Sequence, residues 1–329
     1  MRIALDAMGG DHAPAEIVAG AREALAAAPG LELTLVGDRE KILACWPAAA
    51  TAERLEILHC DQVIDMSEHP AMAFRKKKDA SITVATRQVK EGRAAAVVSA
   101  GSTGAQMVAA IFVLGRIKGV ERPAIGSFIP TPGEPCFLLD IGANLDSSPE
   151  NLAQYAWLGK IYYESALGVQ DPAIYLLSNG VEAEKGDERT QKAHQLLAAA
   201  PGLRFRGNVE ARDILRGEAR VIITDGFAGN VALKTMEGTA AVLFDLMREA
   251  FAADARSKLG ALLLRPALRR IKKRLDYEEY GGAPLLGVNG LSVVCHGSSK
   301  AAAIKTALLR AMEWADAGLR RRLAEHDFQ

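Results

Sequence analysis

Apolar and polar positions follow one another along this chain in blocks. A short apolar run ends in a glycine-rich polar turn, and a helical pattern follows. This block occurs five times, with apolar runs at 3–5, 94–100, 136–139, 220–223 and 291–295. Runs of this length suit buried strands, and the segments after them have the apolar repeat of a helix. The first helix is expected over 15–28 with Pro14 at its start, where a missing N–H has no helical partner.

The five turns carry side chains that bind ligands, and they expose backbone N–H groups beside the positive end of a helix, which favours anions. One such turn is usually structural. In open parallel sheets, however, ligands bind beyond the carboxyl ends of the strands, so we expect five polar turns to gather in one cleft. The candidate binding residues are Asp6, Gly9, Gly10, Asp11, His12, Gly101, Ser102, Thr103, Gly104, Asp140, Asn144, Gly226, Gly229, His296, Ser298 and Ser299.

The alternation of strand and helix patterns predicts an α/β protein with a mostly parallel open sheet and helices on both faces. A length of 329 residues allows one large domain or two. No low-complexity linker divides the sequence. We therefore expect a single catalytic unit over 1–329, with a soft subdivision near 146–150, where Ser147-Ser148-Pro149 begins a new helix.

Composition excludes several classes of protein. Forty basic and forty acidic residues cancel, so no overall field attracts nucleic acid, and an aromatic content of 5% argues against a base-stacking surface. The cysteines have no CxxC spacing and are expected to be free thiols in a reducing, cytoplasmic compartment. The histidines lack metal-ligand spacing, so no metal site is expected. The first turn begins within ten residues of the start, so no targeting segment is expected before it.

The 22 residues between Arg93 and Arg116 carry no charge, which is long enough to suggest a membrane-spanning helix. Gly101 to Gly104 and Gln106 lie in the middle of this run. The two apolar halves fit a buried strand and a buried helix better.

A basic amphipathic helical segment is expected over 254–276, which holds eight basic residues between Asp254 and Asp276. Its leucines recur at helical spacing, and Leu262 and Leu263 add an apolar tip just before Pro266. Such a helix can lie on an anionic membrane or receive an acidic protein. Alternatively, its apolar stripe packs into a dimer or into the core. The predicted contact residues are Leu262, Leu263, Leu264, Arg265, Leu268, Arg269, Arg270, Lys272 and Lys273.

Several motifs carry a family resemblance over essentially the whole chain. They are MGGDHAP at 8–14, SAGSTGA at 99–105, LDIGAN at 139–144, DGFAGNVALKTMEG at 225–238, and GAPLLGVNG with HGSS at 282–290 and 296–299. In this order they resemble the PlsX family of bacterial phosphate acyltransferases. Departures from the family pattern occur at Ser102, Lys300 and 79–81.

The resemblance implies a fold like that of isocitrate and isopropylmalate dehydrogenases and phosphotransacetylase. The implied reaction moves a long-chain acyl group from acyl carrier protein to orthophosphate, and the acyl phosphate then serves a glycerol-3-phosphate acyltransferase in phospholipid synthesis. No cofactor is implied. The family members are homodimers associated peripherally with the membrane. The resemblance also places Lys185 and Asn230 at the active cleft as donors to an oxyanion, and we count Asp225, from the motif of Asn230, with them as catalytic.

The chemistry fits these residues. Orthophosphate is already anionic and needs positioning more than deprotonation, and a thiolate leaves without a strong acid. This agrees with the lack of a GxSxG elbow. A decarboxylating dehydrogenase of this fold would need clustered aspartates to bind a divalent metal, whereas Asp6, Asp140 and Asp225 are spread along the chain. Two other interpretations remain. One is a phosphotransacetylase that uses coenzyme A, and the other is a membrane-bound scaffold for lipid enzymes.

Overall fold

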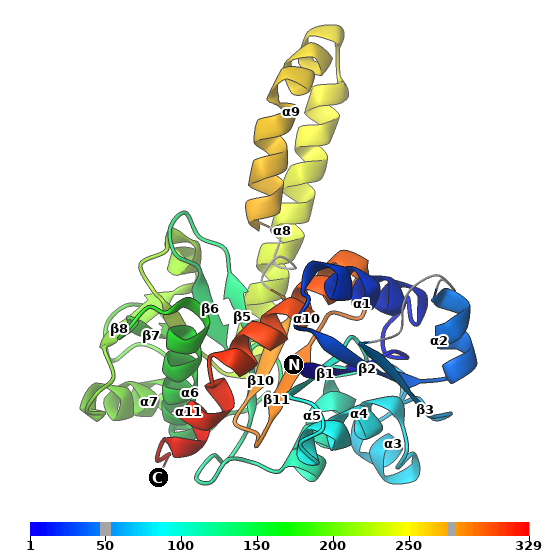
Figure 1. The fold of residues 1–329 in the computed structure, drawn as a ribbon. Helices are drawn as coiled ribbons and strands as arrows, with labels where there is room; N and C mark the ends of the chain where they lie inside the picture. The colour runs from blue at the N-terminus through cyan, green and yellow to red at the C-terminus, as the bar shows by residue number, and fades with distance from the viewer. Residues whose placement is uncertain (47–53, 276–280, 329) are drawn as a thin grey trace.

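All five strand–turn–helix blocks belong to one sheet of eleven strands (Figure 1). The structure, a computed structural model, describes residues 1–46, 54–275 and 281–328, without the side chains of 272–275. The strands are β1 (Arg2–Asp6), β2 (Glu32–Gly37), β3 (Leu55–His59), β4 (Ala96–Ser99), β5 (Ala124–Ile129), β6 (Cys136–Leu139), β7 (Ile174–Ser178), β8 (Phe205–Glu210), β9 (Val221–Ile223), β10 (Ala283–Leu286) and β11 (Leu291–Val294).

The order of strands across the sheet is β3-β2-β1-β4-β11-β10-β5-β6-β9-β7-β8. Neighbouring strands are parallel from β3 to β11 and again from β6 to β8. Between these halves, β10 is antiparallel to both β11 and β5, and β5 is antiparallel to β6. The two parallel halves therefore run in opposite directions, and their turns do not share one sheet edge. The prediction of a mostly parallel sheet is confirmed.

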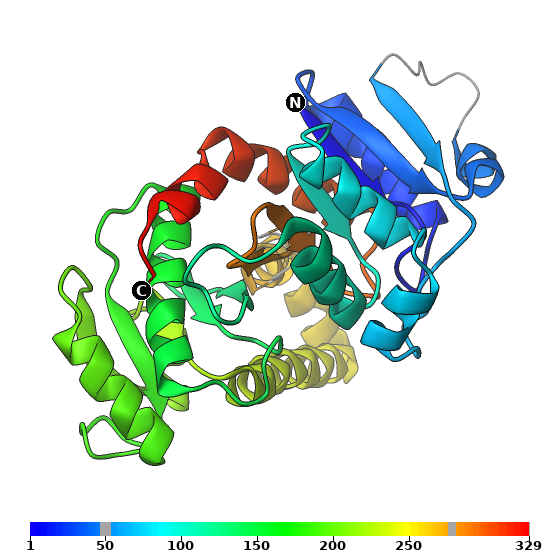
Figure 2. The same cartoon turned by 90° about the horizontal axis from the view of Figure 1, so that it is seen from below.

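Helices cover the sheet on both faces. They are α1 (Ala15–Ala27), α2 (Arg39–Cys45), α3 (Pro70–Lys76), α4 (Ser81–Lys90), α5 (Thr103–Ala109), α6 (Pro149–Leu167), α7 (Glu188–Ala199), α8 (Gly226–Ala252), α9 (Ala255–Leu275), α10 (Ala301–Asp316) and α11 (Leu319–Glu325). A π turn, Ala110–Leu114, continues α5, and a 3₁₀ turn, Ala211–Arg216, follows β8. In Figure 2, α6 and α7 lie at one end of the molecule and α1 and α2 at the other.

Side-chain alternation along β1 explains why both faces are covered. Ile3 and Leu5 belong to the buried cluster that contains residues of α1 and α10, whereas Ala4 belongs to the cluster that contains residues of α4 and α5. Successive side chains of a strand point to opposite faces, so β1, whose central positions are all apolar, must be covered on both faces. The same first cluster continues through Tyr155 and Tyr162 of α6, which ties the two halves of the sheet together.

Local signals set the helix ends. Ser148 caps α6 by accepting from Asn151 N, while the Asn151 side chain accepts from Ser148 N, which completes a capping box. The uncharged run between Arg93 and Arg116 forms β4, α5 and the π turn, as expected. Cys60, Cys136 and Cys295 are buried and Cys45 is half-buried, and these four cysteines form no disulfide among the described residues.

Helices α8 and α9 form an antiparallel hairpin that projects from the body (Figure 1). No helix in the described residues is long and apolar enough to cross a membrane. The expected basic helix is present as α9, with Leu262 and Leu263 in its interior and the turn of the hairpin near Asp254. The helix starts there because the Asp254 carboxylate accepts from Ser257 N at 2.9 Å. Pro266 stays inside the helix.

Candidate functional site

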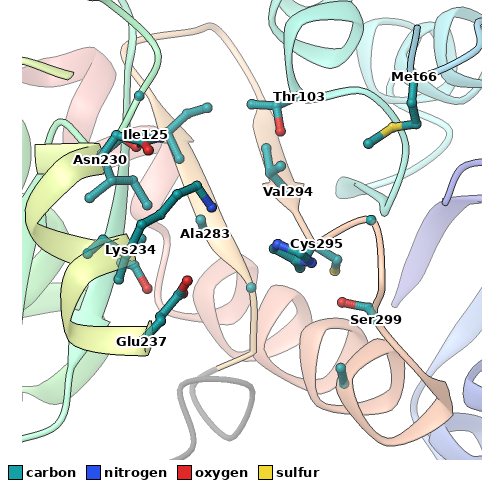
Figure 3. A pocket seen from close by; sticks show the side chains of 18 of the residues that line it. Met66, Thr103, Ile125, Asn230, Lys234, Glu237, Ala283, Val294, Cys295 and Ser299 are labelled. Carbon is teal, nitrogen blue, oxygen red and sulfur yellow. The ribbon is translucent and has the colours of Figure 1, made fainter. Parts of the chain in front are cut away.

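A pocket of about 390 Å³ lies over the reversal of strand direction. We call it the central pocket. Its floor includes Ile125 and Ser127 of β5, Ala283 at the start of β10 and Val294 at the end of β11. Figure 3 shows α8 on one side of it and Met66, Thr103 and Ser299 on the other. Each of the five polar turns, or the helix that follows it, contributes to the lining.

The wall formed by α8 consists of Asn230, Leu233, Lys234 and Glu237. These positions recur at intervals of three and four residues and so share one face of the helix. Nδ2 of Asn230 donates to the carbonyl of Ile141 at 3.0 Å, which fixes the amide at the pocket edge. Nζ of Lys234 has no hydrogen-bond or ion-pair partner among the described residues, and its side chain extends into the pocket (Figure 3).

Three turns of the first half form the opposite wall and are tied to one another. Oγ of Ser99 donates to Oδ2 of Asp6 at 2.7 Å and accepts from Gly101 N at 3.0 Å. Asp11 N donates to the carbonyl of Gly297 at 2.8 Å. The turns after β1, β4 and β11 therefore form one hydrogen-bonded unit.

Close approach in this unit requires glycine. A Cβ on Gly9 would lie 2.6 Å from Oδ2 of Asp6 and 2.7 Å from Gly101 N, closer than real Cβ atoms come. Burial raises the pKa of Asp6, although its hydrogen bonds lower it in part. Asp6 thus builds the wall from behind and does not line the pocket.

In the second half, Asp140 organises the turn after β6. Its carboxylate accepts from the backbone N–H groups of Gly142, Ala143 and Asn144 at 3.0, 2.9 and 2.8 Å. Burial raises the pKa of Asp140, against the lowering effect of these bonds. Nδ2 of Asn144 also donates to Asp140, at 3.0 Å. Gly142, which lines the pocket together with Ile141, is thereby fixed beside Asn230.

Asp225 begins α8 as its N-cap. Its Oδ1 accepts from Phe227 N and Ala228 N, both at 2.9 Å, and Oδ2 is 3.0 Å from Nη2 of Arg189. A Cβ on Gly229 would lie 1.9 Å from the carbonyl oxygen of Asp140, so only glycine allows α8 to pack this close to the turn. Gly226 N donates to the carbonyl of Asn144 at 2.8 Å. These contacts hold the base of α8.

The turn after β11 presents His296 and Ser299 to the central pocket. Nδ1 of His296 lies 2.7 Å from Oγ of Ser298, which orients the imidazole from outside the pocket. Ser299 is buried. Two potential cations, Lys234 and His296, and two acids, Asp11 and Glu237, therefore surround the space. No three metal-ligating side chains cluster in the described part of the chain.

Several predicted residues lie elsewhere. Asp225 lines a second cavity of about 720 Å³, formed with Ser178, Arg189 and Phe227 on the other side of α8. Lys185 is exposed on the loop before α7 and lines neither cavity. His12 is exposed and also outside the lining. Gly9, Gly10, Gly101, Ser102, Gly104 and Asn144 shape the turns behind the pocket surface.

The sequence analysis missed Lys234, Glu237 and Met66, which all line the central pocket. The sequence does contain a signal for Lys234 and Glu237. Once Asn230 is taken as a site residue on a helix, positions four and seven residues later share its face. Met66 has no comparable signal, because the position of its loop depends on the packing of α3 against α5, where Pro70 contacts Gly104.

Solved structures share this fold. EutD phosphotransacetylase from Staphylococcus aureus matches 96% of this chain and 94% of its own, with a TM-score of 0.62 and 17% identity. A phosphotransacetylase from Streptococcus pyogenes matches the same shares, with a TM-score of 0.64 and 18% identity. At these identities the likeness concerns the fold alone. The protein is therefore an α/β protein with the fold of these phosphotransacetylases and a pocket between its halves that carries both polar and apolar side chains.

Sequence relatives define the family. The profile of the family described as "Fatty acid synthesis protein" matches residues 1–322. The phosphate acyltransferase of Desulfitobacterium hafniense is 53% identical, with 97% of this chain and 95% of that protein covered. The phosphate acyltransferase of Heliobacterium modesticaldum is 55% identical, with 94% and 92% covered. The chain belongs to the phosphate acyltransferase family.

Proposed function

We propose that this protein transfers a long-chain fatty acyl group from an acyl carrier protein thioester to orthophosphate, giving an acyl phosphate for phospholipid synthesis. The proposal needs no cofactor. Its main support is the central pocket, in which Asn230 and Lys234, the latter without a partner in the part of the chain that the structure describes, face the hydrogen-bonded turns of the other half. Hydrogen-bond donors and a lysine cation around one small space can bind a phosphate anion and stabilise the oxyanion that forms when it attacks a carbonyl group.

In the proposed reaction an oxygen of orthophosphate attacks the thioester carbonyl carbon. The C–S bond then breaks, and its electron pair leaves with sulfur as a thiolate, whose parent thiol has a pKa of about 8.5. The transient oxyanion accepts from Nδ2 of Asn230, since an amide nitrogen carries two hydrogens and Ile141 uses one. Lys234, His296 and Thr103 hold the phosphate. The role predicted for Lys185 from the family resemblance stays a prediction.

The acyl chain requires an apolar surface next to these polar groups. Ile125, Ile141, Leu233 and Val294 line the same pocket. Each methylene buried on such a surface contributes about 0.8 kcal/mol. The reacting carbonyl then lies at the polar rim with its chain over this floor.

We further propose that the protein is a cytoplasmic homodimer that binds anionic membranes peripherally. Leu262, Leu263 and Leu264 on α9 are exposed, next to Arg265 and Arg269. The side chains of Lys272 and Lys273 lie outside the described residues. Exposed apolar side chains on α8, among them Leu243 and Leu246, offer a surface to a second copy. An acyl phosphate hydrolyses readily, so a membrane-bound glycerol-3-phosphate acyltransferase suits as its consumer.

The test is thiol release from palmitoyl carrier protein by the purified protein, with and without orthophosphate and with no metal or nucleotide added. We expect release to require phosphate and to yield palmitoyl phosphate. Equal release without phosphate would contradict the proposal. Turnover of palmitoyl-coenzyme A at a higher kcat/KM than the carrier thioester would favour the coenzyme A reading instead. Lipid-enzyme recruitment without any turnover would favour the scaffold.

A further inference from the structure

An exposed apolar surface lies beside the mouth of the central pocket. The side chains of Met66, Met72 and Phe112 are 50%, 56% and 68% exposed. The ring of Phe112 stacks on Phe74 of α3 with ring centroids 5.6 Å apart, so α3 and the π turn after α5 form one surface. We call this surface, together with the exposed cations Arg75, Lys76 and Lys78, the α3 patch.

Three cations accompany these apolar side chains. Arg75, Lys76 and Lys78 are exposed, and their side chains have no hydrogen-bond or ion-pair partner among the described residues. Lys77, between them, is paired with Glu68. Unpaired cations next to exposed apolar groups are typical of a surface that receives an acidic partner.

The α3 patch is continuous with the rim of the pocket. Met66 lines the pocket itself, and so does Thr103, the first residue of α5. Pro70, the first residue of α3, packs against Gly104, where a Cβ would lie 2.6 Å from its ring. Along the helix axis Phe112 is about 14 Å from Thr103. A protein bound on the patch would therefore stand directly at the pocket entrance.

We propose that the α3 patch docks the acidic carrier protein, with the prosthetic arm passing Met66 into the central pocket. The proposal rests on the proposed function. The carrier contributes acidic side chains to Arg75, Lys76 and Lys78, and apolar side chains to Met72 and Phe112. A free small thioester has no such surface and gains nothing from the patch.

The other basic surface, on α9, is the obvious competitor for the carrier. If α9 lies on the membrane, its leucines and arginines are covered by lipid and are not available to a soluble partner. The α3 patch lies on the opposite side of the body from the hairpin (Figure 1), so a carrier protein bound there leaves the hairpin free. Membrane and carrier then bind at the same time.

The test compares two acyl donors in the variant Arg75→Glu/Lys76→Glu/Lys78→Glu. We expect kcat/KM for palmitoyl carrier protein to fall by roughly tenfold or more at low salt, because charge reversal removes electrostatic steering. The loss should shrink as salt is added. With palmitoyl-pantetheine, which lacks the protein surface, kcat/KM should equal that of the parent. A second variant, Met72→Ser/Phe112→Ser, should give the same difference between donors without its dependence on salt.

The matched control is Arg269→Glu/Arg270→Glu on α9, which should leave turnover of the soluble carrier thioester unchanged. Parent-like use of the carrier by both α3 variants overturns the proposal, and so does a loss with the α9 control alone. An equal loss with both donors also overturns it, since the defect then lies in the pocket or the fold. Failure of the proposed function is distinct, because the unmodified protein would then turn over neither donor with phosphate.

Discussion

Gly142 leaves the space that Asn230 occupies: a Cβ at residue 142 would lie 2.7 Å from Nδ2 of Asn230. The backbone at Gly142 has φ +139°, a region that favours glycine. The turn organised by Asp140 and the first turns of α8 are thus built for each other. The position of the Asn230 amide depends on both.

This relationship predicts a non-additive pair of variants. Asn230→Ala should lower kcat by roughly 10²-fold, the effect of losing one oxyanion donor. Gly142→Ala should lower kcat to a similar degree by displacing the amide. The double variant should be little worse than either single one, as measured by phosphate-dependent thiol release. If the loss of kcat in the double variant equalled the product of the two single losses, the two residues would act independently.

Two lysines can be told apart by their kinetics. Lys234→Ala should raise KM for orthophosphate by about tenfold, because it removes a cation from the central pocket, and Lys234→Arg should restore part of the affinity. The family resemblance predicts a fall in kcat of roughly 10²-fold for Lys185→Ala. Near-normal turnover by the latter variant would remove the loop before α7 from the site. A normal phosphate KM for Lys234→Ala would exclude Lys234 as the phosphate ligand.

The ion pairs of Glu164 predict a pH-dependent stability. Oε1 lies 2.7 Å from Nζ of Lys160 and Oε2 lies 2.7 Å from Nη2 of Arg322. Burial alone would raise the pKa of Glu164, but its bonds to these cations lower it below the ordinary 4.5. Because the folded pKa is the lower one, the stabilisation is complete above pH 4.5 and is lost as the pH falls through the folded value.

Glu164→Gln should therefore cost about 2 kcal/mol of unfolding free energy at pH 7. Chemical denaturation at several pH values measures this cost. The difference from the unmodified protein should narrow below pH 4.5. If the loss of unfolding free energy in Glu164→Gln did not depend on pH, it would come from altered packing and not from the ion pairs.

The exposed leucines of α9 predict membrane binding with two separable components. Replacing Leu262, Leu263 and Leu264 with Ser should release the protein from anionic vesicles at any salt concentration, because apolar burial is not screened. Charge reversal at Arg269, Arg270, Lys272 and Lys273 should weaken binding mainly at low salt, with about 1 kcal/mol lost per cation near the surface. Vesicle flotation measures both. Parent-like flotation of both variants would mean that the stripe packs against protein.

The strands and polar turns were readable from the sequence because their signals are local. β6 and β9 are uninterrupted apolar runs, as is the centre of β1, and the helix that Ser148 caps begins where its capping pattern lies. The reversal of strand direction at β10 and β5 could not be predicted from the sequence, because a short strand has the same apolar pattern whether its neighbour is parallel or antiparallel. Residues on both sides of that reversal line the central pocket, whereas Asp6 and Asp140 support its walls from behind. Lys234 was missed for a different reason, since on a helix it resembles any solvated lysine until the opposite wall is known.

The long helix α8 also has a mechanical consequence. It is fixed at Asp225 and extends for 27 residues, about 40 Å, into the hairpin, while Asn230 lies only about 7.5 Å from the fixed end. The Asn230 amide therefore lies near the fixed end of a long, rigid helix. A sideways shift of 1 Å at the far end moves Asn230 by about 0.2 Å. Displacements at the far end of the hairpin therefore reach the Asn230 amide reduced about fivefold, so the geometry of its 3.0 Å bond to Ile141 changes little when something binds there.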